Sequence, residues 1–199
     1  MKTSDIQPGD LFDPELEDST LIVVPAHMVL DGQLMSLDSG FLFDARNALG
    51  ARFALEAGGA ARRDNRGGAY GFSAIRNPIK DRRGYRAAHG VGILQSRFSW
   101  WETPDLKLIK QGFTALRKWM VANKGFPVRV GCPGLPYVPK ERIVEIINDE
   151  IPTYLQHRLT VISRRQPTTA AAFSACCPAP TVPAGNIAGF LPWKEGNDG

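Results

Sequence analysis

Leu-Ile-Val-Val-Pro-Ala-His at residues 21–27 is the stretch that decides the fold, and Gly-Asp-Leu-Phe at residues 9–12 precedes it. The apolar run 21–24 predicts a strand that is buried on both faces, and Pro25, which lacks an N–H group, marks its end. A loop with two glycines follows over 31–40. A strand, such a loop and a helix in this order can present backbone N–H groups to an anion. An ordinary strand-to-helix connection is the commoner explanation of this spacing.

Helical and extended patterns alternate along the rest of the chain. We expect helices over 40–55, from 104 to about 123 and from 139 onward, and strands at 91–94, 128–130 and 159–162. Thr103 is the expected N-cap of the second helix, with Pro104 in its first position. Such alternation predicts an α/β fold with a substantially parallel sheet.

Length and composition limit the class of protein. The 199 residues are 43% hydrophobic and 22% charged, as in ordinary soluble globular proteins. No apolar run approaches the roughly 20 residues that span a bilayer, and the first residues do not resemble a secretory signal. Three cysteines, two of them adjacent, make no disulfide framework, so we expect a cytoplasmic protein. The histidines and cysteines lack metal-ligand spacing, and we expect neither a metal nor a cofactor.

The sequence predicts one domain over 1–163 with a Gly- and Arg-rich insertion at 57–90. Eight basic residues and two acidic ones lie between 62 and 86. We expect a flexible segment with at most one short strand, near 70–75. It is either a solvated loop or an arm that contacts phosphate, which suits arginine. Residues 164–199, rich in Ala and Pro, are expected to be a tail packed on the domain or on a second copy of the chain in a homo-oligomer.

Four segments carry a family resemblance, and they stand in this order: Gly9–Phe12, Ala26-His27 with Met35 and Gly40, Ile93–Trp101 with Thr103–Leu106, and Val130–Gly134 with Pro139–Ile147. In this order they resemble the macrodomain family, the ADP-ribose-binding α/β/α module, and above all its terminal ADP-ribose glycohydrolase and bacterial DNA-ADP-ribose hydrolase branch. The resemblance implies a three-layer α/β/α fold with a central mixed, mostly parallel sheet. It also implies ADP-ribose or a related NAD-derived nucleotide as the ligand, recognised on, or removed from, ADP-ribosylated protein or nucleic acid.

The resemblance implies that three loops contact this ligand. Asp10, beside Leu11, would accept a hydrogen bond from the adenine amine; otherwise Asp10 is an exposed turn residue. The backbone at Ser39, Gly40 and Phe41 would approach the distal ribose and the diphosphate at a helix N-terminus, which favours anions. The second phosphate loop would approach the diphosphate from the other side with Cys132, Pro133, Gly134, Leu135 and Tyr137. Tyr137 stacks on a ribose or base, or simply packs in the loop.

The chain also departs from the pattern of this branch. Ser96-Arg97 stands where the branch has Thr-Lys, with a catalytic lysine. Arginine stays protonated, so covalent chemistry of the lysine type is not expected at Arg97. The second phosphate loop contains prolines, which remove N–H donors, and no acidic residue. The first loop is longer than the pattern and brings additional carboxylates, among which Asp38 is the best-placed candidate base.

Three functions stay open, and we rank them in this order. The first is binding of ADP-ribose with little or no turnover. The second is hydrolysis of ADP-ribosyl groups by water, with Asp38, Asp44 or His27 as the catalytic group, although His27 just past a buried strand is better explained as a structural histidine. The third is a structural or interaction module that has lost the ligand.

Overall fold

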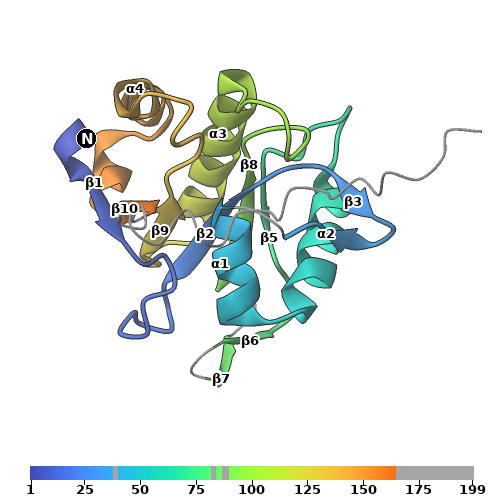
Figure 1. Ribbon diagram of the computed structural model, residues 1–199. Coiled ribbons are helices and arrows are strands. Elements are labelled where there is room, and N and C mark those ends of the chain that lie inside the picture. Colours follow the sequence, from blue (N-terminus) through green and yellow to red (C-terminus); the bar gives the residue numbers. More distant parts are fainter. Residues whose placement is uncertain (38–39, 82–83, 87–89, 165–199) are drawn as a thin grey trace, which may run out of the picture. The chain divides into compact units, whose positions relative to one another are not determined.

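A six-stranded sheet forms the centre of the computed structural model, which describes residues 1–37, 40–81, 84–86 and 90–164, with nothing stated of the side chains of 85 and 86 (Figure 1). Its strands, in spatial order, are β1 (Ile6–Gly9), β10 (Leu159–Arg164), β9 (Val128–Gly131), β2 (Leu21–Ala26), β8 (Val91–Gln95) and β5 (Phe72–Ala74). Neighbouring strands run parallel, except that β5 is antiparallel to β8. The predicted mixed, mostly parallel sheet is confirmed.

Helices cover both faces of the sheet and complete the three layers. On one face lie α1 (Gly40–Leu49) and α2 (Arg52–Asp64), and on the other lie α3 (Leu106–Ala122) and α4 (Lys140–Glu150); η1 (Thr3–Asp5) and α5 (Thr153–Gln156) are short. Successive residues of β2 explain this arrangement because they point to opposite faces. Ile22 and Val24 belong to the core beneath α1 and α2, whereas Leu21 and Val23 belong to the core beneath α3 and α4. The predicted α/β/α architecture is therefore correct.

The helix expected over 40–55 is two helices. Gly50, with φ +75°, ends α1, and its N–H donates to the Arg46 carbonyl at 2.9 Å. The second helix, α2, continues to Asp64, so the segment predicted to be flexible begins inside a packed helix. Gly58 shows how tightly it packs, because a Cβ there would lie 2.2 Å from the Gln33 carbonyl oxygen.

The structure contains more short strands than the sequence predicts. β5 lies where one strand was expected, but β6 (Ile79–Asp81) and β7 (Gly84–Arg86) form a further hairpin in the same segment. Another hairpin, β3 (Leu30–Asp31) with β4 (Leu34–Met35), lies between β2 and α1.

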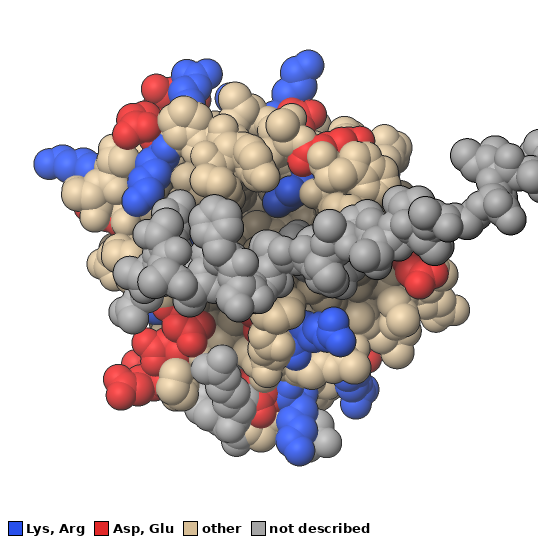
Figure 2. Space-filling view, in the orientation of Figure 1, with Lys and Arg blue, Asp and Glu red and all other residues tan. Residues whose placement is uncertain are grey.

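The face in Figure 2 carries basic side chains at several separate places, with acidic ones between them.

The start of α3 corrects the predicted N-cap. Asp105, not Thr103, is the N-cap, and its carboxylate accepts a hydrogen bond from the Lys107 N–H at 2.7 Å. The N–H of Asp105 itself donates to the Ser96 carbonyl at 2.8 Å. The helix therefore begins two residues later than expected, because this anchor to the residue after β8 fixes its first turn.

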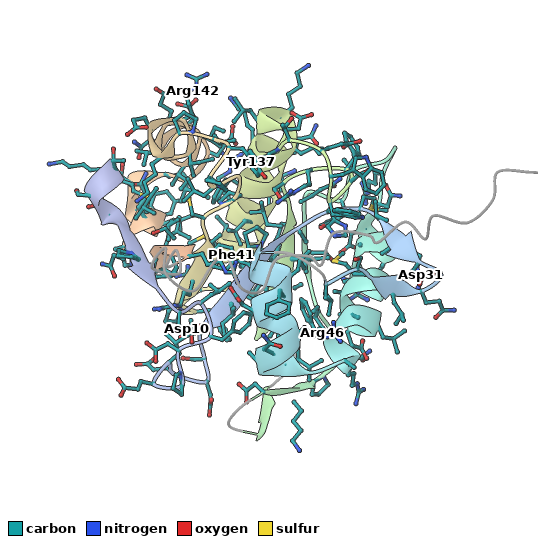
Figure 3. All side chains as sticks on the ribbon, viewed as in Figure 1. Asp10, Asp31, Phe41, Arg46, Tyr137 and Arg142 are labelled. Carbon is teal, nitrogen blue, oxygen red and sulfur yellow. The ribbon has the colours of Figure 1, made fainter. Side chains whose placement is uncertain are left out.

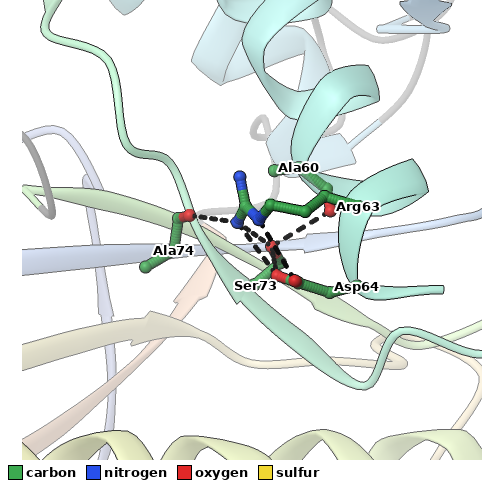
Figure 4. Close-up of polar contacts among 5 residues, drawn as sticks. All are labelled: Ala60, Arg63, Asp64, Ser73 and Ala74. Atoms are coloured by element: carbon green, nitrogen blue, oxygen red, sulfur yellow. Dashed lines mark hydrogen bonds and ion pairs between the residues drawn. The ribbon is translucent and has the colours of Figure 1, made fainter.

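A polar cluster fastens the end of α2 to β5 (Figure 4). The Nη2 of Arg63 donates to the Ser73 hydroxyl at 3.0 Å and to the Ala74 carbonyl at 2.9 Å, and it pairs with Asp64 at 2.9 Å. Ser73 Oγ lies within hydrogen-bond distance of both Asp64 Oδ2 and the Ala60 carbonyl. Burial raises the pKa of Asp64, but hydrogen bonds from Arg63 and Ser73 and the charges of Arg63 and Arg76 outweigh it, so this pKa is below its usual value.

One compact unit begins at Met1 and contains all the described residues. Of the tail predicted over 164–199, only Arg164 falls within the described residues, so that prediction stays open. Within the described ranges, no helix has the length and apolar character needed to cross a membrane. The same residues contain no group of three or more histidine, cysteine or acidic side chains arranged to hold a metal ion.

Candidate functional site

The strand order predicts a ligand crevice at the carboxyl edge of the sheet, and we call this place the crevice. Neighbouring strands β2 and β9 are parallel, so both end at this edge. The chain leaves β2 toward α1 on one face, and it leaves β9 toward α4 on the other face. Where neighbouring strands continue to opposite faces, the loops diverge and leave a crevice, which is the usual ligand site of open α/β sheets. The strands β1 and β8 end at the same edge, so the loops that follow them begin there.

The first turn of α1 lies directly against the end of β9. Gly131 permits this contact because a Cβ there would lie 2.7 Å from Pro25 Cδ and 2.9 Å from Phe41 Cδ2. The first N–H groups of a helix have no partner within the helix, and they carry a partial positive charge. Gly40 and Phe41 therefore bring an anion-favouring helix end to the crevice (Figure 3). Asp38 and Ser39, predicted for the same loop, lie outside the described residues.

The loop after β9 has few backbone donors left for a ligand. Its Tyr137 and Val138 N–H groups donate to the Gly134 carbonyl at 2.9 and 3.0 Å, and the Cys132 N–H donates to Ile162 at 2.7 Å. Pro133 and Pro136 have no N–H group. Among the described loop residues up to Val138, the N–H groups of Gly134 and Leu135 make no hydrogen bond. This loop can offer those two donors to a phosphate.

The side chain of Cys132 is poorly suited to nucleophilic chemistry at neutral pH. It is 2% exposed, and burial raises the pKa of its thiol to about 12, although the charge of Lys140 acts in the opposite direction. Pro133 and Gly134 are buried too, and Leu135 is half-buried. The residues predicted here are thus brought to the crevice mainly through their backbone.

Asp10 follows β1 and has an exposed side chain. Its Oδ1 accepts a hydrogen bond from the Phe12 N–H at 2.9 Å, and its carbonyl oxygen accepts one from Arg129 Nη2 at 2.8 Å. Leu11 is 1% exposed and belongs to the core beneath α1 and α2. Only the backbone of Leu11 is therefore available to a ligand, whereas the carboxylate of Asp10 is accessible.

Ser96 and Arg97 follow β8 and behave differently from each other. Ser96 is 2% exposed, and both its N–H and its hydroxyl donate to the Ala26 carbonyl, at 2.9 and 3.2 Å. Its hydroxyl thus joins β8 to β2. Arg97 is half-buried and donates to the Trp100 carbonyl at 3.1 Å. Burial lowers the pKa of Arg97, and the nearby Tyr137 raises it, so the loops after β8 and β9 meet at this pair.

Four large aromatic side chains are exposed on these two loops, and we call Phe98, Trp100, Trp101 and Tyr137 the aromatic rim. Their exposed fractions are 43%, 50%, 64% and 67%. Trp100 and Trp101 meet edge to face, with ring centroids 5.3 Å apart. Sequence reasoning singled out Tyr137 alone; the signal it missed was a pair of tryptophans between a strand and a helix, where no core is available to bury them.

The remaining candidate bases are held by other groups. Asp44, on α1, accepts two hydrogen bonds from Arg164, from Nε at 2.8 Å and Nη2 at 2.9 Å. His27 is 2% exposed, and its carbonyl accepts a hydrogen bond from the Tyr70 hydroxyl at 3.3 Å. Asp31 lies at the outer end of the β3–β4 hairpin (Figure 3). Asp44 is thus engaged by Arg164, and His27 is buried, so neither is a free general base in this structure.

Comparison with known proteins identifies the fold. The chain is similar to the macrodomain of Thermus aquaticus DarG, with a TM-score of 0.54 and 12% identity over 81% of this chain and 97% of that one. It is similar also to the macrodomain of Mycobacterium tuberculosis DarG, with a TM-score of 0.52 and 14% identity over 82% and 97%. No protein-family model and no curated protein matched the sequence. The architecture predicted from the four resembling segments is confirmed: the chain has the macrodomain fold.

Proposed function

We propose that the chain binds ADP-ribose or a related NAD-derived nucleotide in the crevice at the carboxyl edge of the sheet. The observation that carries this proposal is the contact of Phe41 with Gly131. It brings the positive end of α1 to the point where the loops after β2 and β9 diverge. A diphosphate is anionic, and a helix N-terminus stabilises an anion through both its N–H groups and its dipole. The N–H groups of Gly134 and Leu135 are the matching donors on the opposite loop.

Asp10 supports the adenosine end of this proposal. A carboxylate has several acceptor positions, so the hydrogen bond from Phe12 does not exhaust its capacity. An exocyclic amine is a donor and suits such an acceptor. Asp10 follows the edge strand β1, separated from β9 by β10, so a nucleotide running from Asp10 to α1 would cross the carboxyl ends of these strands.

Binding with little turnover ranks above hydrolysis. The candidate base Asp44 is already paired with Arg164, and Arg97 supplies a permanent positive charge instead of a nucleophilic amine. Such a charge at the crevice suits a phosphate oxygen. Asp38 remains the candidate base of the alternative, an ADP-ribosyl hydrolase.

The aromatic rim favours nucleic acid over protein as the macromolecule that carries the ADP-ribose. Exposed aromatic rings stack on unpaired bases, and each stacked base contributes about 1–3 kcal/mol. The arginine within this loop adds a cation that attracts the phosphate backbone. We therefore propose a single-stranded, ADP-ribosylated nucleic acid as the larger ligand.

Calorimetric titration with ADP-ribose tests the central proposal. We expect saturable binding below millimolar ligand, and no binding at about 1 mM, a limit near 4 kcal/mol, would overturn it. Asp10→Ala should weaken the affinity. Asp13→Ala is the matched control, because the Asp13 carboxylate accepts the N–H two residues on in the same way.

Fluorescence anisotropy with single-stranded oligonucleotides, with and without ADP-ribose, tests the larger ligand. Trp100→Ala and Trp101→Ala should weaken binding of the modified strand while leaving free ADP-ribose binding intact. Tyr154→Ala, an exposed aromatic on α5, is the control. Equal affinities of all three variants for the strand would reject the rim, and tighter binding of an ADP-ribosylated peptide would favour a protein partner. Release of free ADP-ribose from the strand in the same samples would support the hydrolase alternative.

A further inference from the structure

Arg129 lies beneath Asp10 and has an unusual set of partners. It is on β9, between Val128 and Val130, which belong to the core beneath α3 and α4, so its side chain lies on the other face. Its Nη2 donates to the Asp10 carbonyl at 2.8 Å. Its Nε is buried and has no hydrogen-bond partner among the residues that the structure describes. In the same residues no carboxylate forms an ion pair with it.

An arginine with these surroundings does not favour the stability of the folded state. A buried N–H group without a partner lowers the stability of the folded state, and an apolar side chain of similar length would avoid this loss. The contact that Arg129 does make is with the backbone of the residue proposed to recognise the base. The cost in stability therefore indicates a role at Asp10.

The turn after β1, which carries Asp10, has few hydrogen bonds from the sheet to hold it in place. Within the described part of the sheet, β1 is an edge strand of four residues that pairs with β10 alone, and it ends in Pro8-Gly9. The guanidinium lies beside Gly9, since a Cβ there would make ordinary contact with Arg129 Nη2 at 3.7 Å. The Arg129 bond fixes the Asp10 carbonyl, and the Phe12 bond fixes its carboxylate. Both bonds thus restrain Asp10, one at its carbonyl and one at its carboxylate.

We infer that Arg129 is a positioning residue that holds Asp10 in place and thereby sets the preference for a base with an exocyclic amine. This inference rests on the proposed function. A carboxylate accepts a hydrogen bond from the amine of adenine, whereas the carbonyl oxygen of hypoxanthine at that position is another acceptor and repels it. A displaced carboxylate loses this discrimination, because hydrogen bonds depend on distance and angle.

The test compares ADP-ribose with inosine diphosphate ribose, by calorimetry, in the full chain and in Arg129→Met. We expect Arg129→Met to melt at the same temperature or higher. Its affinity for ADP-ribose should fall about tenfold, as when one charge-assisted hydrogen bond is misplaced, and the ratio of the two affinities should fall with it. Arg117→Met is the matched control, because Arg117 also donates to a backbone carbonyl, that of Glu150, but on α3. That control should leave the ratio unchanged.

An unchanged ratio in Arg129→Met would overturn the inference. If the wild-type chain binds neither nucleotide, the proposed function itself fails, which is a different result. Should Arg129→Met not fold, Arg129→Lys and Asp10→Asn form a double-mutant cycle on ADP-ribose affinity. Because both changes act through one carboxylate, their effects should be less than additive, and additive effects would contradict the inference.

Discussion

The ring of Phe41 lies against the α-carbon of Gly131, so the first turn of α1 and the end of β9 approach as closely as their backbones allow. A Cβ at Gly131 would meet Phe41 Cδ2 at 2.9 Å and Pro25 Cδ at 2.7 Å, both shorter than any ordinary contact between carbon atoms. Phe41 is buried, and Pro25 is held by its ring within β2, so neither neighbour can turn away to make room. Glycine at this position therefore permits the close approach of α1 to β9.

Gly131→Ala should consequently lower both stability and affinity for ADP-ribose. Overpacking of this kind costs about 1–3 kcal/mol, which lowers the melting temperature by several degrees in a domain of this size. Gly59→Ala is the control, since Gly59 lies in α2 and a Cβ there meets no atom within 4 Å. That variant should gain about 0.5–1 kcal/mol from helix propensity. Similar melting temperatures for the two variants would contradict the prediction.

The pair of Asp44 with Arg164 should contribute to stability as a unit. Two parallel hydrogen bonds join the carboxylate on α1 to the guanidinium at the end of β10. We expect Asp44→Ala and Arg164→Ala each to destabilise the chain modestly, and the double variant to be less destabilised than their sum. Because the pair is partly exposed, a coupling of up to about 1 kcal/mol is expected in urea unfolding. If the losses of unfolding free energy in the two single variants are additive, the two side chains do not interact in solution, and Asp44 is then available as a base.

The cluster at the end of α2 should make stability depend on pH in the acid range. The pKa of Asp64 is lower in the folded chain than its usual value of 3.8, so the unfolded chain binds more protons near that pH. Its contribution is therefore present above about pH 4 and is lost as the pH falls through the folded pKa. The difference in unfolding free energy between the wild type and Asp64→Asn should be constant from about pH 7 to about pH 5 and shrink below about pH 4. A difference that grows in acid would contradict this assignment.

Strands of the sheet could be predicted from the sequence where all their residues are apolar and buried. Residues 21–24 are at most 2% exposed, and a continuous apolar run needs no further information to be recognised as a buried strand. β1 was missed because Ile6 is its only buried residue and Pro8 and Gly9 disfavour strands. It is a strand because the edge of β10, from the other end of the chain, pairs with it.

The same distinction applies to the site. Asp10, Gly40 and Gly134 stand within short segments that resemble a known family, so the sequence alone suggests them as ligand contacts, and these roles stay predictions. Arg129 and Arg164 act through partners more than a hundred positions away, and no local pattern specifies such a pair. The roles predicted for Asp38 and Ser39 stay predictions.

Cys132 should be inert toward thiol reagents while the chain is folded. The thiolate is the reactive form, and a pKa of about 12 leaves only about one thiol in ten thousand ionised near pH 8. The side chain is also 2% exposed, so a reagent cannot reach the sulfur without opening the loop after β9. In a chain carrying Cys176→Ser and Cys177→Ser, iodoacetamide should label Cys132 slowly in buffer and rapidly in urea, as followed by mass spectrometry. Labelling in buffer at the rate of free cysteine would show that this loop opens readily, and the crevice would then lack the fixed second wall that the proposed diphosphate contact requires.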